Sequence, residues 1–387
     1  MRHIQCSSAY LTYGEKMPLY RNFNLVLMVT ADCNLGCRYC YIGKRAGRVM
    51  PLAFAQKAVE RSLNSLDEGG KLELGFFGGE PLLEPWLVEA TADYARRRSG
   101  ETGRGLAMHL TTNGTLAGGA AWEVLQRDDI HIAVSCDGLA DIHDRNRTTF
   151  GGRGTWQQVQ ETLRLLLAAG RDPWVVMVVG PDTVQQLAPS ICFLADMGVS
   201  FIQPSLNLWS SWAPEALEHL ERALAECADI WRQAEGRPGI GWFDEMGAAM
   251  AGIPGDTCAR CAFGAGQIAV TPTGNLYPCE RLVADDEADN PWRMPGHVAN
   301  GQDFLAYRPC QARSHPSCDA CTIRDICGTT CRCSNYVRTG DVARPDRLLC
   351  QLNQACFREV SRVLEASTAA GACDTRNRST GQKGKPQ

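Results

Sequence analysis

Three cysteines lie close together near the start of the chain. Cys33, Cys37 and Cys40 have C-x3-C-x2-C spacing and follow an apolar run, 23–29, that is typical of a buried strand. Structural zinc sites and ordinary ferredoxin clusters take four protein ligands. Three thiolates on one loop therefore indicate a [4Fe–4S] cluster with one iron open to a small molecule. Zinc binding and plain redox cysteines are the alternatives.

Further polar motifs stand at the ends of later apolar runs. They are Gly78-Gly79-Glu80-Pro81, Thr112-Asn113-Gly114, Ser135-Cys136-Asp137-Gly138 and His143-Asp144-Arg145-Asn146-Arg147. Paired glycines let a backbone come close to a ligand, although a simple turn would also use them. A guanidinium binds a carboxylate through two parallel hydrogen bonds. The motifs together favour a ligand site at these strand ends.

The C-terminal third is rich in cysteine. Eleven of the nineteen cysteines lie between Cys258 and Cys356, where little continuous helix is expected. Such a segment buries little apolar core and would depend on metal to hold it together. No basic and apolar export signal begins the chain, so metal binding is favoured over disulfides. A pair of zinc ribbons is the alternative to iron–sulfur clusters here.

The positions of these motifs follow from an alternation of strands and helices. Strands are expected at 23–29, 72–76, 106–111, 130–135, 174–179 and 201–206, with helices near 52–66, 85–98, 119–127, 155–170 and 184–197. This order predicts an α/β fold with a parallel sheet, open or partly closed. Ligands bind at the carboxyl ends of such strands, where the motifs lie.

Composition excludes several other classes of protein. The formal net charge of -4 shows no basic footprint for nucleic acid. No apolar stretch reaches the roughly 18–20 residues that span a bilayer. A cytoplasmic protein that binds neither nucleic acid nor membrane is expected.

The motifs resemble those of the radical S-adenosylmethionine (SAM) superfamily. C-x3-C-x2-C, GGEP, S-x-D-G and H-D-x-x-R are similar to the branch that contains anaerobic sulfatase-maturing enzymes and peptide maturases. The C-terminal pattern C-x12-G-x4-C, C-x2-C-x5-C-x3-C and a final C resembles the SPASM domain. The resemblance implies a partial (β/α)6 TIM-like barrel followed by a cysteine-rich iron–sulfur domain. Its expected divisions are an N-terminal extension (1–23), the barrel (24–235), a bridge (236–257), the SPASM domain (258–356), a C-terminal helix (357–373) and a disordered tail (374–387).

The resemblance implies a role for each residue of the first site. Cys33, Cys37 and Cys40 would hold the cluster that binds SAM, and the GGEP motif would receive the SAM amino group. Ser135 and Arg147 would contact the ribose and the carboxylate, and Tyr39 would lie near the adenine. The complete set of expected SAM contacts is Tyr39, Gly78, Gly79, Glu80, Pro81, Asn113, Ser135 and Arg147.

Two auxiliary [4Fe–4S] clusters are implied for the C-terminal domain. Cys261, Cys279 and Cys331 would bind the inner cluster, and Cys318, Cys321, Cys327 and Cys350 the outer one. Cys258 is the upstream candidate for the remaining inner ligand, although Cys310 or Cys333 could substitute. Glu280 stands where sulfatase maturases carry a general base, but it could instead form an ion pair with Arg281.

The implied activity is that of a radical SAM/SPASM maturase. An external electron donor such as a flavodoxin or ferredoxin would reduce the first cluster. The 5′-deoxyadenosyl radical would then abstract hydrogen from a peptide or protein, leading to a thioether or carbon–carbon crosslink. Oxidation of Cys or Ser to formylglycine is the alternative within the class, and a non-catalytic iron–sulfur electron carrier is the alternative outside it. Because only some twenty residues precede the first strand, we expect no leader-binding module, and a separate partner could deliver the substrate.

Overall fold

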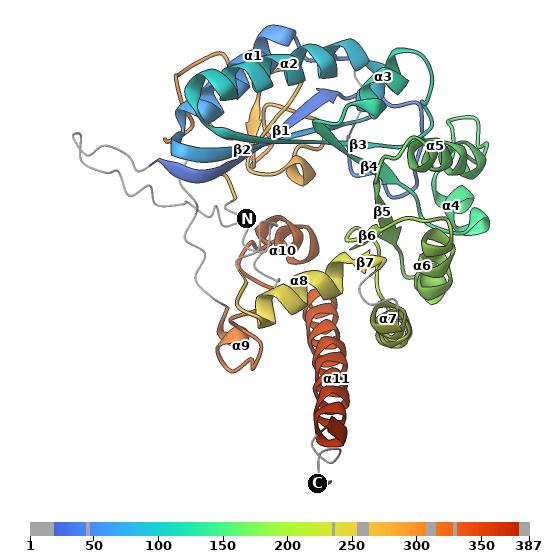
Figure 1. The fold of residues 1–387 in the computed structure, drawn as a ribbon. Helices are drawn as coiled ribbons and strands as arrows, with labels where there is room; N and C mark the ends of the chain where they lie inside the picture. The colour runs from blue at the N-terminus through green and yellow to red at the C-terminus, as the bar shows by residue number, and fades with distance from the viewer. Residues whose placement is uncertain are drawn as a thin grey trace, which may run out of the picture.

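The computed structural model describes residues 19–43, 47–233, 237–253, 263–306, 315–327 and 331–378, with side chains to residue 365. Its centre is a curved sheet in the order β7-β6-β5-β4-β3-β2-β1-β8-β9 (Figure 1). The strands are β1 (Tyr20–Thr30), β2 (Leu66–Gly78), β3 (Gly105–Thr112), β4 (Ile130–Ser135), β5 (Trp174–Val179), β6 (Phe201–Leu206), β7 (Gly239–Ile240), β8 (Gln267–Val270) and β9 (Leu276–Tyr277). All neighbouring pairs are parallel except β8 with β9. The predicted α/β fold is therefore confirmed, with each of the six expected strands in place.

Helices cover the outer face of this sheet. They are α1 (Leu52–Asn64), α2 (Pro85–Thr102), α3 (Ala120–Gln126), α4 (Ala140–Asn146), α5 (Trp156–Ala168), α6 (Leu187–Asp196) and α7 (Pro214–Gln233). In α1 the buried residues Ala55, Ala58, Val59 and Leu63 recur at helical spacing, so one apolar stripe faces the core. The short helix α4 was missed from sequence, because its seven residues carry too little apolar periodicity.

The C-terminal region is joined to the barrel by backbone pairing. β8 extends the sheet beyond β1, with Asn24 opposite Gln267 and Leu27 opposite Val270. From α1, the buried Arg61 donates hydrogen bonds to the carbonyl oxygens of Asp303 and His297. The two regions share one sheet and one hydrophobic core, which the expected division at residue 258 did not suggest.

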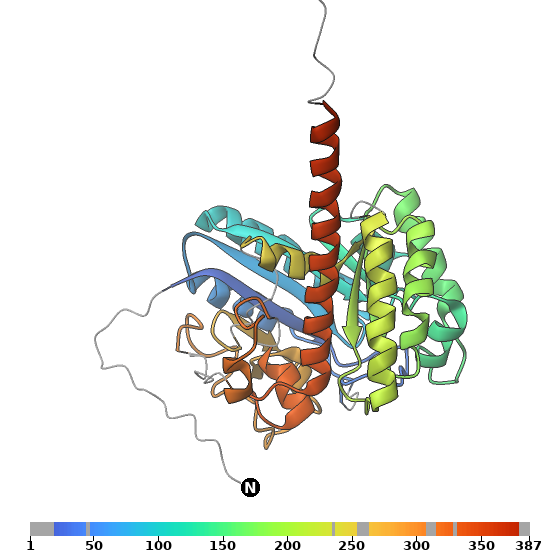
Figure 2. The same cartoon turned by 90° about the horizontal axis from the view of Figure 1, so that it is seen from below.

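The stretch expected to be a bridge, 236–257, is ordered in its described part. It contains β7 and α8 (Gly241–Met250), which continue the barrel pattern by one further unit. Further along the chain lie α9 (Pro316–Asp319), α10 (Arg332–Thr339) and α11 (Arg347–Arg378). α11 begins before the expected helix at 357 and extends past 374, where a disordered tail was expected. It packs against α7 and α8 and then projects from the body of the protein (Figures 1 and 2).

None of the described helices is long and apolar enough to cross a membrane.

Candidate functional site

The cysteine loop is held at the carboxyl edge of the sheet by backbone hydrogen bonds. The amide of Gly36 donates to the carbonyl of Thr148 at 2.7 Å, and that of Arg38 donates to Asn146 at 2.9 Å. Leu35 is fully buried beneath the loop. The segment after α4 therefore fixes the loop between the first and third cysteines.

Two glycines let the end of β2 approach the start of this loop. The amides of Gly79 and Glu80 each donate at 2.8 Å, to the carbonyls of Thr30 and Asp32. A Cβ on Gly78 would lie 2.3 Å from the Thr30 oxygen, and one on Gly79 would lie 1.9 Å from the Asp32 oxygen. Gly78 also has a φ of 126°, which disfavours other residues. Any side chain at either position would displace the loop.

The three thiols face a common space. Burial raises the pKa of the Cys37 thiol, Arg147 lowers it, and Cys33 and Cys40 raise it again because their thiols lie nearby. The Asn113 amide, following β3, also reaches the Cys33 sulfur at 3.7 Å. Three sulfur ligands and one buried cation form a donor set that fits an iron–sulfur cluster.

Glu80 points away from this space and ties strand ends together. Its carboxylate accepts hydrogen bonds from the Leu82 amide (3.0 Å), the Thr112 hydroxyl (2.8 Å) and the Asn113 amide (2.6 Å). Burial raises the pKa of Glu80 to about 7 against the opposing effect of those bonds. Glu80 and Pro81 do not line the cavity, so in this structure they position the loop and Asn113.

Asp137 is a functional residue that the sequence analysis left without a role. Its carboxylate accepts a hydrogen bond from Arg147 Nε at 3.2 Å and one from the Tyr39 hydroxyl at 2.5 Å. The Arg147 guanidinium also lies 5.3 Å from the centre of the Tyr39 ring. Burial lowers the pKa of Arg147, but Asp137, Tyr39 and Cys37 together raise it above its ordinary value, so the cation is kept. Its position as the aspartate of the S-x-D-G motif was the sequence signal that could have identified Asp137.

His143 supports this pair from behind. Its Nδ1 accepts from the Asp137 amide at 3.3 Å, and its Nε2 lies 3.1 Å from the hydroxyl of Thr155. That hydroxyl donates to the Arg147 carbonyl, so we assign the neutral imidazole with its proton on Nε2. Burial, together with Arg147, lowers the pKa of His143 to about 3.

A cavity of about 260 Å³ joins these groups. Its size is near the lower end for ligand pockets. It is lined by Cys33, Cys37, Tyr39, Cys40, Gly78, Gly79, Asn113, Ser135 and Arg147, together with Tyr41, Trp209, Glu280 and Arg281. Tyr41 and Trp209 stack with their ring centres 4.8 Å apart. The structure thus brings every expected SAM contact except Glu80 and Pro81 to one cavity.

The C-terminal thiols form two groups among the described residues. Burial, together with the nearby thiols of Cys327, Cys318 and Cys321, raises the pKa of Cys350 to about 11. The other group contains Cys279 and Cys331 together with Cys333. Cys258 and Cys261 lie outside the described residues.

Glu280 and Arg281 connect the two regions. Both line the cavity beside Cys33, and the thiol of Cys279 donates to Glu280 at 3.4 Å. No ion pair between Glu280 and Arg281 occurs in the described residues. Arg281 Nη1 instead donates to the Ser334 hydroxyl at 3.4 Å. Burial lowers the pKa of Arg281, but Cys333, Cys279, Tyr41 and Cys331 together raise it well above its ordinary value.

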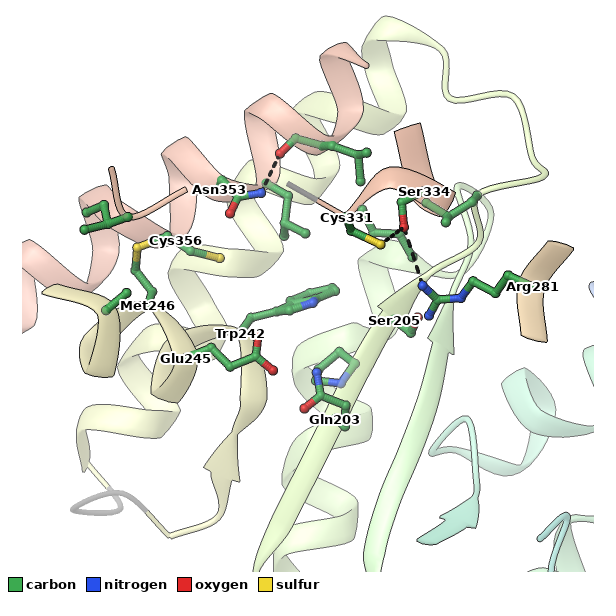
Figure 3. Close-up of a pocket in the computed structure, with 17 residues that line it drawn as sticks. Gln203, Ser205, Trp242, Glu245, Met246, Arg281, Cys331, Ser334, Asn353 and Cys356 are labelled. Atoms are coloured by element: carbon green, nitrogen blue, oxygen red, sulfur yellow. Dashed lines mark hydrogen bonds between the residues drawn. The ribbon is translucent and has the colours of Figure 1, made fainter. Parts of the chain in front are cut away.

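A second cavity of about 260 Å³ adjoins the first, between β6 and α8 on one side and α10 and α11 on the other. Both cavities are lined by Ser205, Leu206, Leu208 and Arg281. In Figure 3, Arg281 and Cys331 converge on Ser334 at one end, while Trp242, Gln203 and Glu245 lie further in. An open pocket of about 620 Å³ reaches the surface past Trp209 and Arg281. Arg281 lines all three spaces.

The fold and site define a class of protein. A parallel α/β partial barrel carries three thiols, a buried arginine and a cavity at the carboxyl edge of its sheet. No three described side chains surround a point for a single metal ion, which would need all its sulfur ligands at about 2.3 Å. Thiolates of a four-iron cluster instead bind separate irons. A loop of three thiols beside a cavity is the kind of site that can hold a cluster with a free coordination position.

Comparisons with known proteins agree with this class. Residues 27–191 match the model of the radical SAM superfamily. An uncharacterized protein of Methanocaldococcus jannaschii is 29% identical over 197 residues, which are 51% of this chain and 65% of that protein, slightly under two thirds of its length. A PqqA peptide cyclase of Gluconobacter oxydans is 25% identical over 84% of this chain and 89% of its own. A cysteine-type anaerobic sulfatase-maturating enzyme of Clostridium perfringens is 22% identical over 80% of this chain and 88% of its own length.

Among solved structures, native anSMEcpe with bound AdoMet and Cp18Cys peptide is similar to this chain. The TM-score is 0.76 at 21% identity, over 90% of this chain and 99% of that one. Over residues 27–191 the chain is thus similar to radical SAM proteins, and over at least 80% of its length to a peptide cyclase and a sulfatase-maturating enzyme. The match to the radical SAM model implies a [4Fe–4S] cluster and SAM as cofactors.

Proposed function

We propose that this chain is a radical SAM/SPASM maturase that modifies a peptide or protein. The observation that carries the proposal is the continuous space from the three N-terminal thiols to the C-terminal region. Cys33, Cys37 and Cys40 would hold a [4Fe–4S] cluster, which would transfer the electron for reductive cleavage of SAM and so give a 5′-deoxyadenosyl radical able to abstract hydrogen from the substrate. A flavodoxin or ferredoxin would supply the electron.

The chain's own residues bind and orient SAM in this proposal. Arg147 binds the methionyl carboxylate while Asp137 holds its guanidinium in place. Ser135, at the end of β4, faces the same cavity and contacts the ribose. Tyr39 packs near the adenine, and the Gly78–Gly79 backbone accepts hydrogen bonds from the SAM amino group. The stack of Tyr41 on Trp209 shields the cavity from solvent.

The substrate is proposed to enter from the open pocket. Trp209 and Arg281 line both this pocket and the first cavity, so a peptide segment passing them would reach the cysteine loop. Glu280 lines the cavity beside Cys33 and accepts a hydrogen bond from Cys279, so it would take a proton from the substrate after hydrogen abstraction, while a proposed auxiliary cluster would accept the remaining electron. The peptide cyclase relative supports a crosslink as the product, either a thioether or a carbon–carbon bond. A separate partner is proposed to deliver the substrate.

Two auxiliary [4Fe–4S] clusters are proposed in the domain spanning 258–356. Their support is the grouping of Cys318, Cys321, Cys327 and Cys350, and the close approach of Cys279 and Cys331 to one further thiol. The anaerobically reconstituted protein should hold about twelve iron atoms, four for each cluster. Zinc in place of iron in anaerobic material would contradict this assignment.

The first experiment measures 5′-deoxyadenosine released from SAM by the dithionite-reduced protein. Release is expected for a maturase, and its absence from fully reconstituted protein would favour an electron carrier. A second experiment supplies candidate peptides and a sulfatase-derived peptide, followed by mass spectrometry. Loss of two hydrogens with a new crosslink supports the proposal, whereas formylglycine on the sulfatase peptide supports the alternative that the sulfatase-maturating relative suggests.

A further inference from the structure

Cys333 lies at the centre of a three-thiol group. Its sulfur is 3.4 Å from that of Cys279 and 3.3 Å from that of Cys331. Cys279 and Cys333 are separated by 54 positions in the chain, so this contact is a product of the fold. Only 2% of Cys333 is exposed. Two members of the group, Cys279 and Cys331, already belong to the proposed inner auxiliary cluster.

The environment of these thiols suits a metal cluster. Phe263, Leu282 and Val342 surround them with apolar side chains. The Arg281 guanidinium lies beside them and donates to the neutral hydroxyl of Ser334, and within the described residues it makes no ion pair with a carboxylate. A buried cation without an anion is costly. Thiolates bound to iron would supply the missing negative charge at that place.

The local backbone allows the thiols to bind different irons. Cys331 is the N-cap of α10 and has extended dihedral angles, whereas Cys333 lies within the first helical turn. Their side chains thus leave the backbone in different directions and meet at their sulfur atoms. A rotation about χ1 of either residue separates the sulfurs without moving the helix.

We propose that Cys333 is a ligand of the inner auxiliary cluster, beside Cys279 and Cys331, in the place expected for Cys258. The C-x-C pair at the start of α10 would then supply two ligands from one turn. This inference rests on the proposed auxiliary clusters. It makes Cys258 dispensable for iron binding and gives Cys333 a function other than packing.

The test uses the full chain with Cys33, Cys37 and Cys40 all replaced by alanine, so that only auxiliary clusters remain. Into this background we introduce Cys333→Ser, Cys258→Ser and, as a matched buried control on α7, Cys227→Ser. Iron content and the EPR spectrum of the reduced protein are measured after anaerobic reconstitution. We expect Cys333→Ser to lose up to half of the iron or to change the spectrum of one cluster. The other two variants should match the background.

Unchanged iron and an unchanged spectrum in Cys333→Ser would overturn the proposal. Loss of iron in Cys258→Ser instead would restore the expected ligand and have the same consequence. A background with no iron at all would overturn the auxiliary clusters themselves, which is a distinguishable result.

A second measurement covers the case in which Cys333→Ser does not fold. The unsubstituted protein is unfolded anaerobically in increasing urea with an alkylating reagent present, and each cysteine is mapped by mass spectrometry. Cys333 should be alkylated together with Cys279 and only as cluster absorbance disappears. Alkylation of Cys333 together with Cys227, before the absorbance is lost, would contradict its being a ligand.

Discussion

Cys33, Cys37 and Cys40 come from one loop, whose backbone is hydrogen-bonded to the residues that follow β2 and to the end of α4. The C-terminal thiols come from distant parts of the chain. In the first region the Gly78–Gly79 contact sets the position of the loop, whatever the thiols bind. In the described part of the second region, only short strands and helices lie between the cysteines. The difference indicates that the fold positions the ligands in the first region, while the ligands stabilise the fold in the second.

The largest effect should come from substitutions in the first region. It should be a loss of SAM cleavage and of iron, with little change in stability. Replacing Cys33, Cys37 and Cys40 together by alanine should reduce 5′-deoxyadenosine formation to background, because no thiolate remains to bind the cluster. About a third of the iron should be lost, while the melting temperature should change little. Iron analysis, product assay and thermal unfolding monitored by circular dichroism test this. A variant that fails to fold would break the comparison.

Arg147 should give the next largest effect. Loss of a charge-assisted pair in a partly dry site costs on the order of 2–4 kcal/mol, or roughly 30- to 1000-fold in SAM affinity. Arg147→Ala should show this loss by equilibrium binding to the reconstituted protein. Arg147→Lys should recover little, because a point charge cannot reproduce the planar fork. The exposed neighbour Arg145→Ala is the matched control, and parent-like binding by Arg147→Lys would contradict a bidentate contact.

The second region should respond in stability. Cys318→Ala should remove a ligand of the proposed outer cluster and, because structural metal sites contribute folding energy directly, should lower the melting temperature by about 5–10 °C. Thermal unfolding of the reconstituted protein measures this. The core cysteine Cys227→Ala is the control for loss of a buried thiol. If Cys318→Ala melts like the parent, the C-terminal fold does not depend on its metal.

Acidification should lower the stability of the folded protein through protonation of His143. The unfolded imidazole binds a proton below about pH 6.5, and the folded one only near pH 3, so stability is present above pH 6.5 and falls as the pH drops. The loss between pH 6.5 and 5 should be roughly 2 kcal/mol. Urea unfolding at pH 6.5 and at pH 5 should show this loss of unfolding free energy for the parent and for the surface control His219→Gln. His143→Gln should remove this pH dependence of the unfolding free energy. An unchanged pH dependence in His143→Gln would show that the titrating group lies elsewhere.

Glu280 should have the smallest effect on SAM cleavage. Glu280→Gln should bind SAM and release 5′-deoxyadenosine as the parent does while losing modified product, because a base acts only after hydrogen abstraction. Glu280→Asp should retain part of the product, since it keeps the carboxylate at shorter reach. Product formation by Glu280→Gln at the parent rate would show that the base lies elsewhere or that none is needed.

Much of the barrel could be predicted because its signals are local. Each of the six strands is a short apolar run, and each motif follows the end of one, so the parallel order placed the motifs at one edge. β8 and α8 were missed because their strand and helix are short and their pairing with distant strands carries no local signature. The length of α11 was underestimated because its later residues are polar, and polarity was taken to indicate disorder.

The candidate site was predictable to the extent that residue type determined chemistry. Spacing identified Cys33, Cys37 and Cys40, and the structure gathers them with Ser135 and Arg147 around one cavity. Asp137 was missed because its role is to hold other side chains, and only the fold shows that Tyr39 and Arg147 both reach it. Cys333 has no place in a spacing pattern, because its contact with Cys279 spans much of the C-terminal region.

The pairing of β8 with β1 has a consequence for synthesis of the chain. β1 is among the first strands to leave the ribosome, yet the strand that covers its outer edge begins at Gln267, some 240 residues later. At about 5–20 residues per second, that edge stays unpaired for roughly 10–50 seconds. An apolar strand with open backbone groups invites pairing with other chains. We therefore expect the nascent barrel to bind chaperones until residues 267–270 have been synthesised and can pair with β1.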